Sequence, residues 1–330
     1  MGVSALLFIL MVATSLVEGH NAWVRVAVNG KWARPFEFIR NLTAPFEELE
    51  RPSCTGCNPR CYVCPTWADY DYPQSVRCGR DNMAHAADTD VLRVKAGDEL
   101  TFLSTTLAQD AWQASGVQWD GCPDGKGVCT PGRTSSPPDR VYHNGPIIAH
   151  LSKVPEGQDV HEYDGSGKWT KIYTMGATLV TDVDREDIPS PYFWKGSVDQ
   201  DFQVSSPPFK FQIPKQTPAG QYLLRMDSVN IGMHTMPKDG SDWIWQSGET
   251  QVYPGCAQIE VQSDYTGSLP EGGVQIPEAL FTKSPGMSLL GVSGEFGPGR
   301  YQRIVLDPEY VYPGGPLWDG EKLVQDRILP

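Results

Sequence analysis

The stretch WVRVAVNG, residues 23–30, alternates, with valine at every second position, and then stops at an Asn-Gly dipeptide. A period of two is typical of a half-buried β-strand, and Asn-Gly is a common tight turn between strands. The stretch VLRVKAGDELTF, residues 91–102, has two shorter alternating runs around Ala96-Gly97-Asp98, which predicts a β-hairpin. Four further segments are predicted to be strands: 146–154, 209–214, 220–229 and 256–262.

The composition favours an all-β fold. With 33 Gly and 28 Pro, the chain cannot sustain many long helices. Short strands that do not alternate with helices predict a β-sandwich of the immunoglobulin-like or fibronectin-like type. Three loops are longer than ordinary connections and are expected to be functional surfaces or disulfide-pinned covers: 41–90, 103–140 and 176–207.

The N-terminus has the pattern of a signal peptide. An apolar run extends from Ala5 to Val17, and Val17 and Gly19 fit the small-residue rule for cleavage before His20. The run is too short to span a membrane, and a short core helix is the alternative interpretation. We therefore expect a signal peptide at 1–19, a secreted β-sandwich domain at 20–290 and a C-terminal extension at 291–330. The extension either packs on the domain or is partly disordered.

The protein is acidic, with a formal net charge of −13 and a pI ≈ 4.9. No basic stripe is present to neutralise phosphates, which argues against binding to nucleic acid or to an anionic membrane. Neutral and cationic partners are compatible with this charge. No other stretch is long and apolar enough for a membrane span, and no heptad pattern is present, so we expect a soluble monomer.

Cysteines in an exported chain predict disulfides. Of the eight cysteines, four are closely spaced as C-x2-C-x3-C-x2-C: Cys54, Cys57, Cys61 and Cys64. In a cytosolic protein this spacing would suggest a zinc or iron–sulfur site, but export favours disulfides. Cys122 and Cys129 can close a small loop, and Cys78 and Cys256 are left for a long-range bridge, although the sequence does not fix the connectivity. The one N-glycosylation sequon begins at Asn41.

Cleavage before His20 would create a metal-binding group. The new α-amine and the imidazole Nδ1 of one residue can chelate a single ion, and the amine titrates close enough to neutrality for a metal to displace its proton. A second histidine would complete three nitrogen ligands in a T shape, which suits Cu(II) better than Mg or Ca. Five histidines are candidates for that position: His85, His143, His150, His161 and His234.

His143 has the most suitable context, because Asn144-Gly145-Pro146 and a predicted strand follow it. A residue on such a loop is expected at the rim of the sandwich, where sites are assembled. Farther along, Gln251 and Tyr253 lie two residues apart in an alternating run and therefore on one side of an extended strand. We expect Tyr253 as an axial neighbour of the metal and Gln251 as a hydrogen-bond partner of an oxygen species. The alternative for Tyr253 is an ordinary buried aromatic with a satisfied hydroxyl.

The chain resembles a known family in five segments that occur in the family's order. They are the signal peptide that ends before His20, YHNGPIIAHLSKV (142–154), GKWTKIY (167–173), FQIPKQTPAGQYLLRMD (211–227) and QVYPGCAQIEV (251–261). These segments are similar to those of the fungal lytic polysaccharide monooxygenases of auxiliary activity family nine, formerly glycoside hydrolase family sixty-one. The resemblance spans most of residues 20–290.

The resemblance implies one copper ion per chain, an external electron donor, and hydrogen peroxide or dioxygen as co-substrate. The residues that it implies for copper binding are His20, through its amine and ring, His143, and Tyr253 in the axial position. The catalytic side chains that it implies beside the metal are His234, Gln251 and Tyr253. The implied substrate is cellulose or a hemicellulose.

Four features depart from the family pattern. Two extra residues separate His234 from Arg225, and a longer loop, PKDGSDWIWQSGE, follows it, so a structural, hydrogen-bonded role is the alternative for this histidine. His150 replaces a usual tyrosine, Leu280 replaces a tyrosine that many members present flat to polysaccharide, and residues 41–77 are longer than the matching family segment. The last two departures weigh against the usual preference for crystalline cellulose.

The leading hypothesis is a secreted copper monooxygenase that cleaves a β-1,4-glucan or related plant-wall polysaccharide at C1 or C4. The same resemblance implies that Cys78 pairs with Cys256. Hydrolysis is disfavoured, because the motifs offer no carboxylate pair placed for acid–base work on a glycoside. Two hypotheses from other classes remain: a copper-binding secreted protein without polysaccharide turnover, and a disulfide-rich carbohydrate-binding module without metal.

Overall fold

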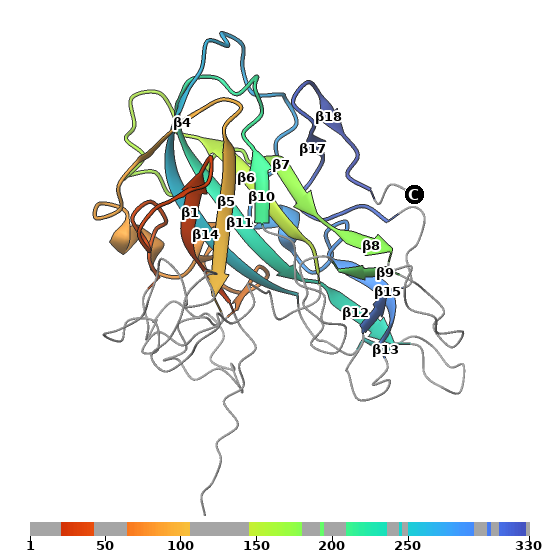
Figure 1. Cartoon of the computed structure of the whole chain (residues 1–330). Helices are drawn as coiled ribbons and strands as arrows, with labels where there is room; N and C mark the ends of the chain where they lie inside the picture. Colours follow the sequence, from red (N-terminus) through yellow and green to blue (C-terminus); the bar gives the residue numbers. More distant parts are fainter. Residues whose placement is uncertain are drawn as a thin grey trace, which may run out of the picture.

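The structure of the protein is a computed structural model, which describes residues 21–42, 65–105, 145–179, 192–194, 209–235, 244–245, 250–293, 302–304 and 310–327. Two sheets lie face to face (Figure 1). The smaller has the strand order β10 (Phe209–Gln212), β5 (Glu99–Thr105), β1 (Ala22–Val28) and β2 (Lys31–Trp32).

The larger sheet has the order β18 (Leu323–Val324), β17 (Leu317–Trp318), β7 (Thr170–Met175), β6 (Ile147–Lys153), β11 (Gly220–Asn230), β14 (Gln251–Gln262) and β3 (Thr66–Trp67). Beside them, β4 (Leu92–Lys95) pairs in parallel with β14. The predicted all-β sandwich is therefore confirmed.

Two small sheets extend from the sandwich at the lower right of Figure 1. One has the order β13 (Ile244–Trp245), β12 (Gly232–Thr235), β15 (Ser288–Ser293) and β16 (Gln302–Ile304), and the other pairs β8 (Ala177–Leu179) with β9 (Tyr192–Trp194). The described helical segments are one or two turns long: α1 (Pro73–Cys78), η1 (Asn82–His85) and η2 (Glu278–Leu280). Two of the predicted long loops, 41–90 and 176–207, thus contain short elements of their own.

Aromatic side chains from the two sheets meet in the core. Tyr173 of the larger sheet stacks on Phe211 of the smaller at 4.8 Å between ring centroids, and Phe211 in turn stacks on Phe102. Trp23 meets Phe209 edge to face at 5.1 Å. Such offset and edge-on pairs add to the stabilisation from buried apolar area, and they fix Trp23 at the start of β1.

The predicted hairpin around Gly97 is wrong. The strand before it, β4, belongs to the larger sheet through β14, whereas the strand after it, β5, pairs with β1 and β10 in the smaller sheet. The turn therefore carries the chain from one sheet to the other, with the Gly97 N–H donating to Ile213 O at 2.9 Å. Alternation could not reveal this, because both strands bury their inward residues in the same core, as the two strands of a hairpin would.

A disulfide joins Cys78, the last residue of α1, to Cys256 in β14. The long-range bridge and the pairing that the family resemblance implied are both confirmed. The other six cysteines lie outside the described residues: Cys54, Cys57, Cys61, Cys64, Cys122 and Cys129. Strand β14 begins at Gln251, five positions before the predicted start at 256. Gly255 permits this extension, because a Cβ there would lie 3.1 Å from Trp23 Cβ.

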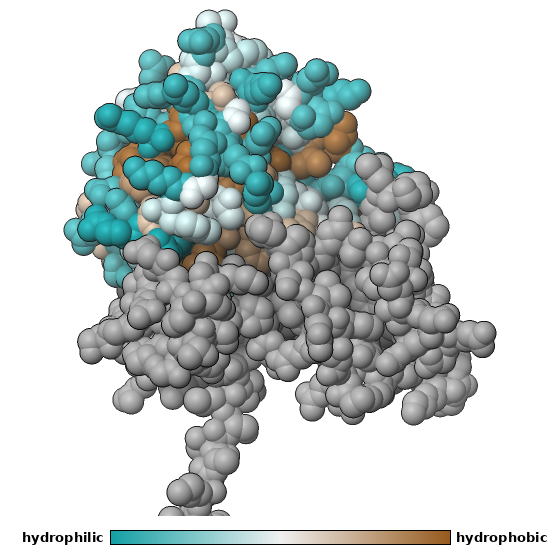
Figure 2. All heavy atoms as spheres, in the orientation of Figure 1, coloured by the Kyte–Doolittle hydropathy of each residue, from teal (hydrophilic) through white to brown (hydrophobic). Residues whose placement is uncertain are grey.

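Residues 310–327 of the C-terminal extension pack against the sandwich. Strand β17 lies parallel to β7, and β18 beyond it forms the outer edge of the larger sheet. The Lys171 ammonium, which is fully buried, contacts Asp326 Oδ2 at 2.7 Å and donates to Pro313 O at 2.9 Å. Figure 2 shows apolar side chains gathered over β17 and β18, where a groove of about 770 Å³ separates this segment from residues 274–285.

His150 lies inside this contact. Its side chain is 0% exposed, and Nε2 donates to Gly314 O at 2.8 Å. Burial holds the His150 pKa well below its usual range, and the positive charges of Arg225 and Lys171 lower that pKa further. The folded protein therefore keeps His150 neutral at pH values where the unfolded chain binds a proton. Of the five histidines that the sequence offers as a second metal ligand, His150 is thus a core residue.

Acid should weaken the fold through His150. The unfolded imidazole protonates below its ordinary pKa near 6.5, so stability is lost as pH falls through that value, by about 2 kcal/mol at pH 5. In His150→Leu this part of the pH dependence should disappear, although the variant is less stable at every pH. Urea unfolding at pH 7 and pH 5 measures the difference. His85→Gln, which changes a half-buried histidine, serves as control. The prediction would be contradicted if the free energy of unfolding fell equally between pH 7 and pH 5 in His150→Leu and in the parent protein.

Candidate functional site

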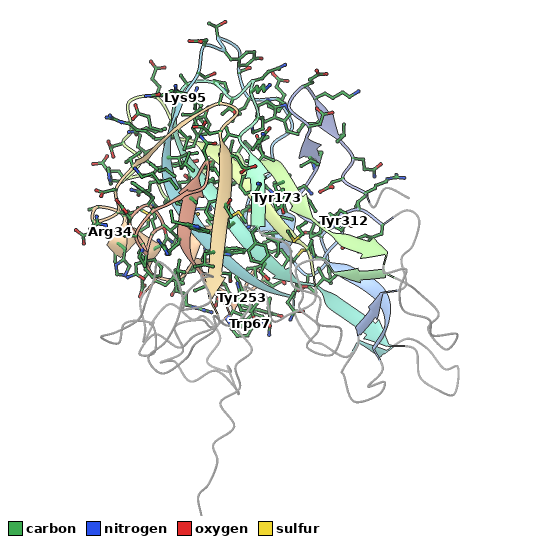
Figure 3. All side chains as sticks on the ribbon, viewed as in Figure 1. Arg34, Trp67, Lys95, Tyr173, Tyr253 and Tyr312 are labelled. Atoms are coloured by element: carbon green, nitrogen blue, oxygen red, sulfur yellow. A yellow bond between two sulfur atoms is a disulfide. The ribbon has the colours of Figure 1, made fainter. Side chains whose placement is uncertain are left out.

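Gln251 and Tyr253 form a hydrogen-bonded pair at the start of strand β14. The Tyr253 hydroxyl donates to Gln251 Oε1 at 3.1 Å, as their shared side of the strand predicted. The Tyr253 side chain is almost fully buried, whereas Gln251 is partly exposed. In Figure 3 Tyr253 lies at the lower edge of the sandwich, close to Trp67. The two side chains that the sequence placed on one side of the strand therefore form one polar pair at this edge.

Asn230 is a third member of this group that sequence reasoning missed. It is the last residue of β11 and lies directly opposite Gln251 in the strand pair. Its Nδ2 donates to the same Gln251 Oε1 at 3.1 Å. Only the register between β11 and β14 brings the two residues together, so no local pattern in the sequence could have identified the contact.

A buried ion pair fixes the backbone at Tyr253. The Tyr253 N–H donates to Asp227 Oδ1 at 2.8 Å, and Arg225 donates to Asp227 Oδ2 at 2.7 Å. Arg225 Nε also donates to Arg77 O at 2.8 Å, next to the disulfide. Burial raises the pKa of the Asp227 carboxyl, and the Arg225 guanidinium and the Tyr253 N–H oppose that rise. We take the pair as charged, because each oxygen of Asp227 has a donor.

The residues that follow His20 approach Tyr253. Trp23 Nε1 donates to Tyr253 O at 3.0 Å, which anchors the start of β1 beside this residue. Asn21 is 3% exposed, yet within the described part of the chain neither polar atom of its amide has a hydrogen-bond partner. Buried polar atoms are normally satisfied, so an orphaned amide next to residue 20 indicates a polar group still to be bound there.

The residues that follow His143 reach the same place. Pro146 O accepts a hydrogen bond from Val229 N at 3.0 Å, one residue before Asn230. Gly145 is required at this contact, because a Cβ there would lie 1.6 Å from Val229 O. His143 and His20 themselves lie outside the described residues. The described residues next to each of them thus converge on the end of β14 that carries Gln251 and Tyr253.

His234 lies in a different sheet. It is on β12, opposite Trp245 of β13 and beside Leu290 of β15. Along an extended strand, four residues beyond Asn230 correspond to about 13 Å. The structure describes the backbone of His234 and not its side chain, so its predicted role stays a prediction.

Two remaining sequence predictions concern the surface around the site. Leu280 is fully buried, so no flat side chain is presented at the position where many relatives have tyrosine. Trp67 instead lies directly opposite Gln251 in the β3–β14 pair, so the two side chains project from the same face of the sheet. Arg80 lies 5.9 Å from the centroid of the Trp67 ring and pairs with buried Asp71 at 2.7 Å. The aromatic-rich stretch TWADYDYP before Cys78 was the available signal.

The residues at this end of the sandwich fit a copper site. Across the described residues no three His, Cys, Asp or Glu side chains converge on one point. The sequence predicts His20 and His143 as the metal ligands, and both lie outside the described residues. An amine, two imidazoles and a phenol oxygen are nitrogen-rich ligands of the kind that Cu(II) prefers. The orphaned Asn21 amide beside residue 20 is what the structure adds to that donor set.

Comparisons with known proteins identify the family of this chain and agree with its fold. The model of Auxiliary Activity family 9 (formerly GH61) matches residues 20–294. Lytic polysaccharide monooxygenase G of Aspergillus tamarii is 27% identical over 97% of this chain and 72% of its own length. Monooxygenase U of Thermothielavioides terrestris is 26% identical over 95% of this chain and 97% of its own length.

Solved structures show the same fold. CvAA9A has a TM-score of 0.50 at 18% identity and covers 93% of this chain and 100% of its own. HiLPMO9B has a TM-score of 0.51 at 16% identity and covers 91% of this chain and 99% of its own. In the described part of the chain no helix is long and apolar enough to cross a membrane.

Proposed function

The chain belongs to Auxiliary Activity family 9, the copper-dependent lytic polysaccharide monooxygenases, and we propose that it cleaves a β-1,4-glucan or related plant-wall polysaccharide by oxidation at C1 or C4. Its activity class is that of a copper-dependent oxidoreductase. The observation that carries the proposal is the convergence on Gln251 and Tyr253 of the residues that follow His20 and His143.

We propose that the amine and ring of His20, the ring of His143 and the hydroxyl of Tyr253 would hold one copper ion. Bound copper supplies the one-electron chemistry that couples an external electron donor to hydrogen peroxide or dioxygen. The protein's own side chains would bind the metal, hydrogen-bond the co-substrate and hold the ligands in position. The Tyr253 hydroxyl donates a hydrogen bond to Gln251 Oε1. Its oxygen can therefore approach a cation while the phenol stays protonated.

The neighbouring side chains have separate roles in this proposal. Gln251 is partly exposed and hydrogen-bonds the oxygen co-substrate, and His234 remains a candidate for the same task. The buried Arg225–Asp227 pair holds Tyr253 in place from below. Trp67, on the same face as Gln251, is a candidate to contact the polysaccharide beside the site.

The family's fungal relatives and the N-terminal pattern support export. We propose that residues 1–19 are removed, that the mature protein is a monomer in the medium, and that Asn41 carries a glycan. The family match begins at residue 20, which agrees with cleavage before His20. It ends at residue 294, close to the predicted domain boundary at 290.

The test is the native mass of the protein secreted from a fungal host, with one equivalent of copper added, followed by incubation with reductant and polysaccharide. We expect a chain that begins at His20, retains one copper ion and releases oxidised oligosaccharides from cellulose, xyloglucan, xylan or glucomannan. A different N-terminus, or no retained copper, would remove the proposed site. Retained copper with no oxidised product from any of the four would favour a copper-binding protein without turnover.

A further inference from the structure

The Gln251 amide is held at its oxygen by two donors. Tyr253 OH and Asn230 Nδ2 each lie 3.1 Å from Gln251 Oε1. A carbonyl oxygen has two lone pairs, so both are occupied. We propose that Asn230 is a positioning residue that fixes the Gln251 amide with its NH2 group toward the open side of the site. Gln251 then acts on the oxygen co-substrate as a hydrogen-bond donor and not as an acceptor.

Tyr253 alone does not determine this orientation. A phenol both donates and accepts, so it can pair with either end of a glutamine amide. Asn230 adds an amide NH2, and a flipped Gln251 would turn its own NH2 toward that donor. Two donors facing each other lose the hydrogen bond and leave polar hydrogens unsatisfied in a partly buried place. With the Asn230 NH2 group facing Gln251, as the structure has it, the observed orientation of Gln251 is the one that satisfies all three side chains together.

The position of Asn230 is itself fixed by the fold. It is directly opposite Gln251 in the strand pair, where Cβ atoms lie about 5 Å apart. The preceding residue, Val229, is clamped by Pro146 O and by the close approach of Gly145. The short segment after His143 therefore fixes the position of Asn230, and Asn230 in turn orients the Gln251 amide.

The inference rests on the proposed function and is tested by reversing the polarity of one atom. Asn230→Asp keeps the shape of the side chain but, when ionised, only accepts. Its carboxylate should draw the Gln251 NH2 group toward itself and leave Oε1 facing the oxygen co-substrate. At pH 7 we expect kcat to fall on the order of a hundredfold, the usual result of losing one transition-state donor, with the KM for polysaccharide unchanged.

Two features of this variant separate positioning from packing. Below the pKa of the new carboxyl its protonated form donates again, so activity should recover toward acid relative to the parent protein. Asn230→Ala, which removes the donor without reversing the polarity, should lose less activity at pH 7 than the isosteric variant. The matched control is Asn29→Asp. Asn29 follows the last residue of β1, at the opposite end of that strand from Trp23, and its Nδ2 donates to Asp98 Oδ1 at 3.0 Å. It adds the same charge and should leave kcat unchanged.

A measurement on the copper-free protein makes the result independent of turnover. In the NMR spectrum of 15N-labelled protein, the Gln251 side-chain NH2 signal is the one that disappears in Gln251→Glu. Its hydrogens should exchange rapidly with water in the parent protein and slowly in Asn230→Asp at pH 7. If the parent protein binds no copper or oxidises no polysaccharide, the proposed function fails, while this exchange rate still reports the orientation. Equal exchange rates in parent and variant, or an unchanged kcat and pH profile in an active enzyme, would overturn the role of Asn230.

Discussion

Replacing Asp227 with alanine should lower the free energy of unfolding by about 3–5 kcal/mol. The change isolates Arg225, whose fully buried side chain pairs with Asp227 Oδ2 at 2.7 Å. A guanidinium in the core without a counter-charge has neither water nor a carboxylate to stabilise it. The same substitution removes the acceptor of the Tyr253 N–H. Urea unfolding at pH 7, followed by tryptophan fluorescence, gives the difference directly.

Two controls distinguish the buried charge from the loss of any side chain. Arg225→Met combined with Asp227→Leu removes both charges and should recover most of the stability, because apolar residues often replace a buried pair at little cost. Arg93→Ala breaks the exposed pair with Glu260, whose partners are 78% and 43% exposed, and should cost less than about 1 kcal/mol. A loss for Asp227→Ala no larger than that for Arg93→Ala would contradict the prediction.

Removing the disulfide with Cys78→Ala and Cys256→Ala should have an effect of similar size. The two residues are 178 positions apart. In the chain-entropy model a bridge that closes so long a loop lowers the entropy of the unfolded chain and thereby raises the free energy of unfolding by about 5 kcal/mol. The double variant should therefore unfold at a clearly lower urea concentration than the oxidised parent protein. The end of α1 should stay in place in the folded variant, because Arg77 O and Val76 O still accept from Arg225 next to residue 78.

The predicted small-loop bridge provides the comparison. In the same model Cys122→Ala with Cys129→Ala removes a bridge over a far shorter loop and should cost roughly half as much. The ratio of the two losses tests loop length as the cause. Equal losses in the two double variants would show that local packing and not loop length dominates.

Much of the fold could be predicted from the sequence, since period-two alternation reports burial on one face of a strand. The segments 146–154 and 220–229 correspond to β6 and β11 within one or two residues. Alternation says nothing about which strand lies alongside, and for that reason the turn at Gly97 was mistaken for a hairpin. The early start of β14 was missed because Pro254 and Gly255 usually end a strand, whereas here Asp227 binds the Tyr253 N–H and Trp23 packs on the glycine.

The candidate site was predictable to the same extent. Gln251 and Tyr253 share a face of one strand, so their spacing alone predicted the pair that the structure shows. Asn230 and Trp67 come from the two strands on either side of β14, and only the registers of those strands place them opposite Gln251. The ion pair beneath Tyr253 was hidden for a different reason. A sequence pattern predicts that charged residues such as Arg225 and Asp227 are exposed to solvent. Here both are buried, because each neutralises the charge of the other.

The position of β17 has a consequence for any shortened form of this protein. Strand β7 would be the edge of the larger sheet without Leu317, and open edge strands recruit strands from other molecules. A chain ending at residue 294, where the family match stops, would uncover that edge and leave the Lys171 ammonium without Asp326. We therefore expect the C-terminal segment to protect β7 from pairing with strands of other molecules, so a chain cut at the family boundary should aggregate more readily than the full chain.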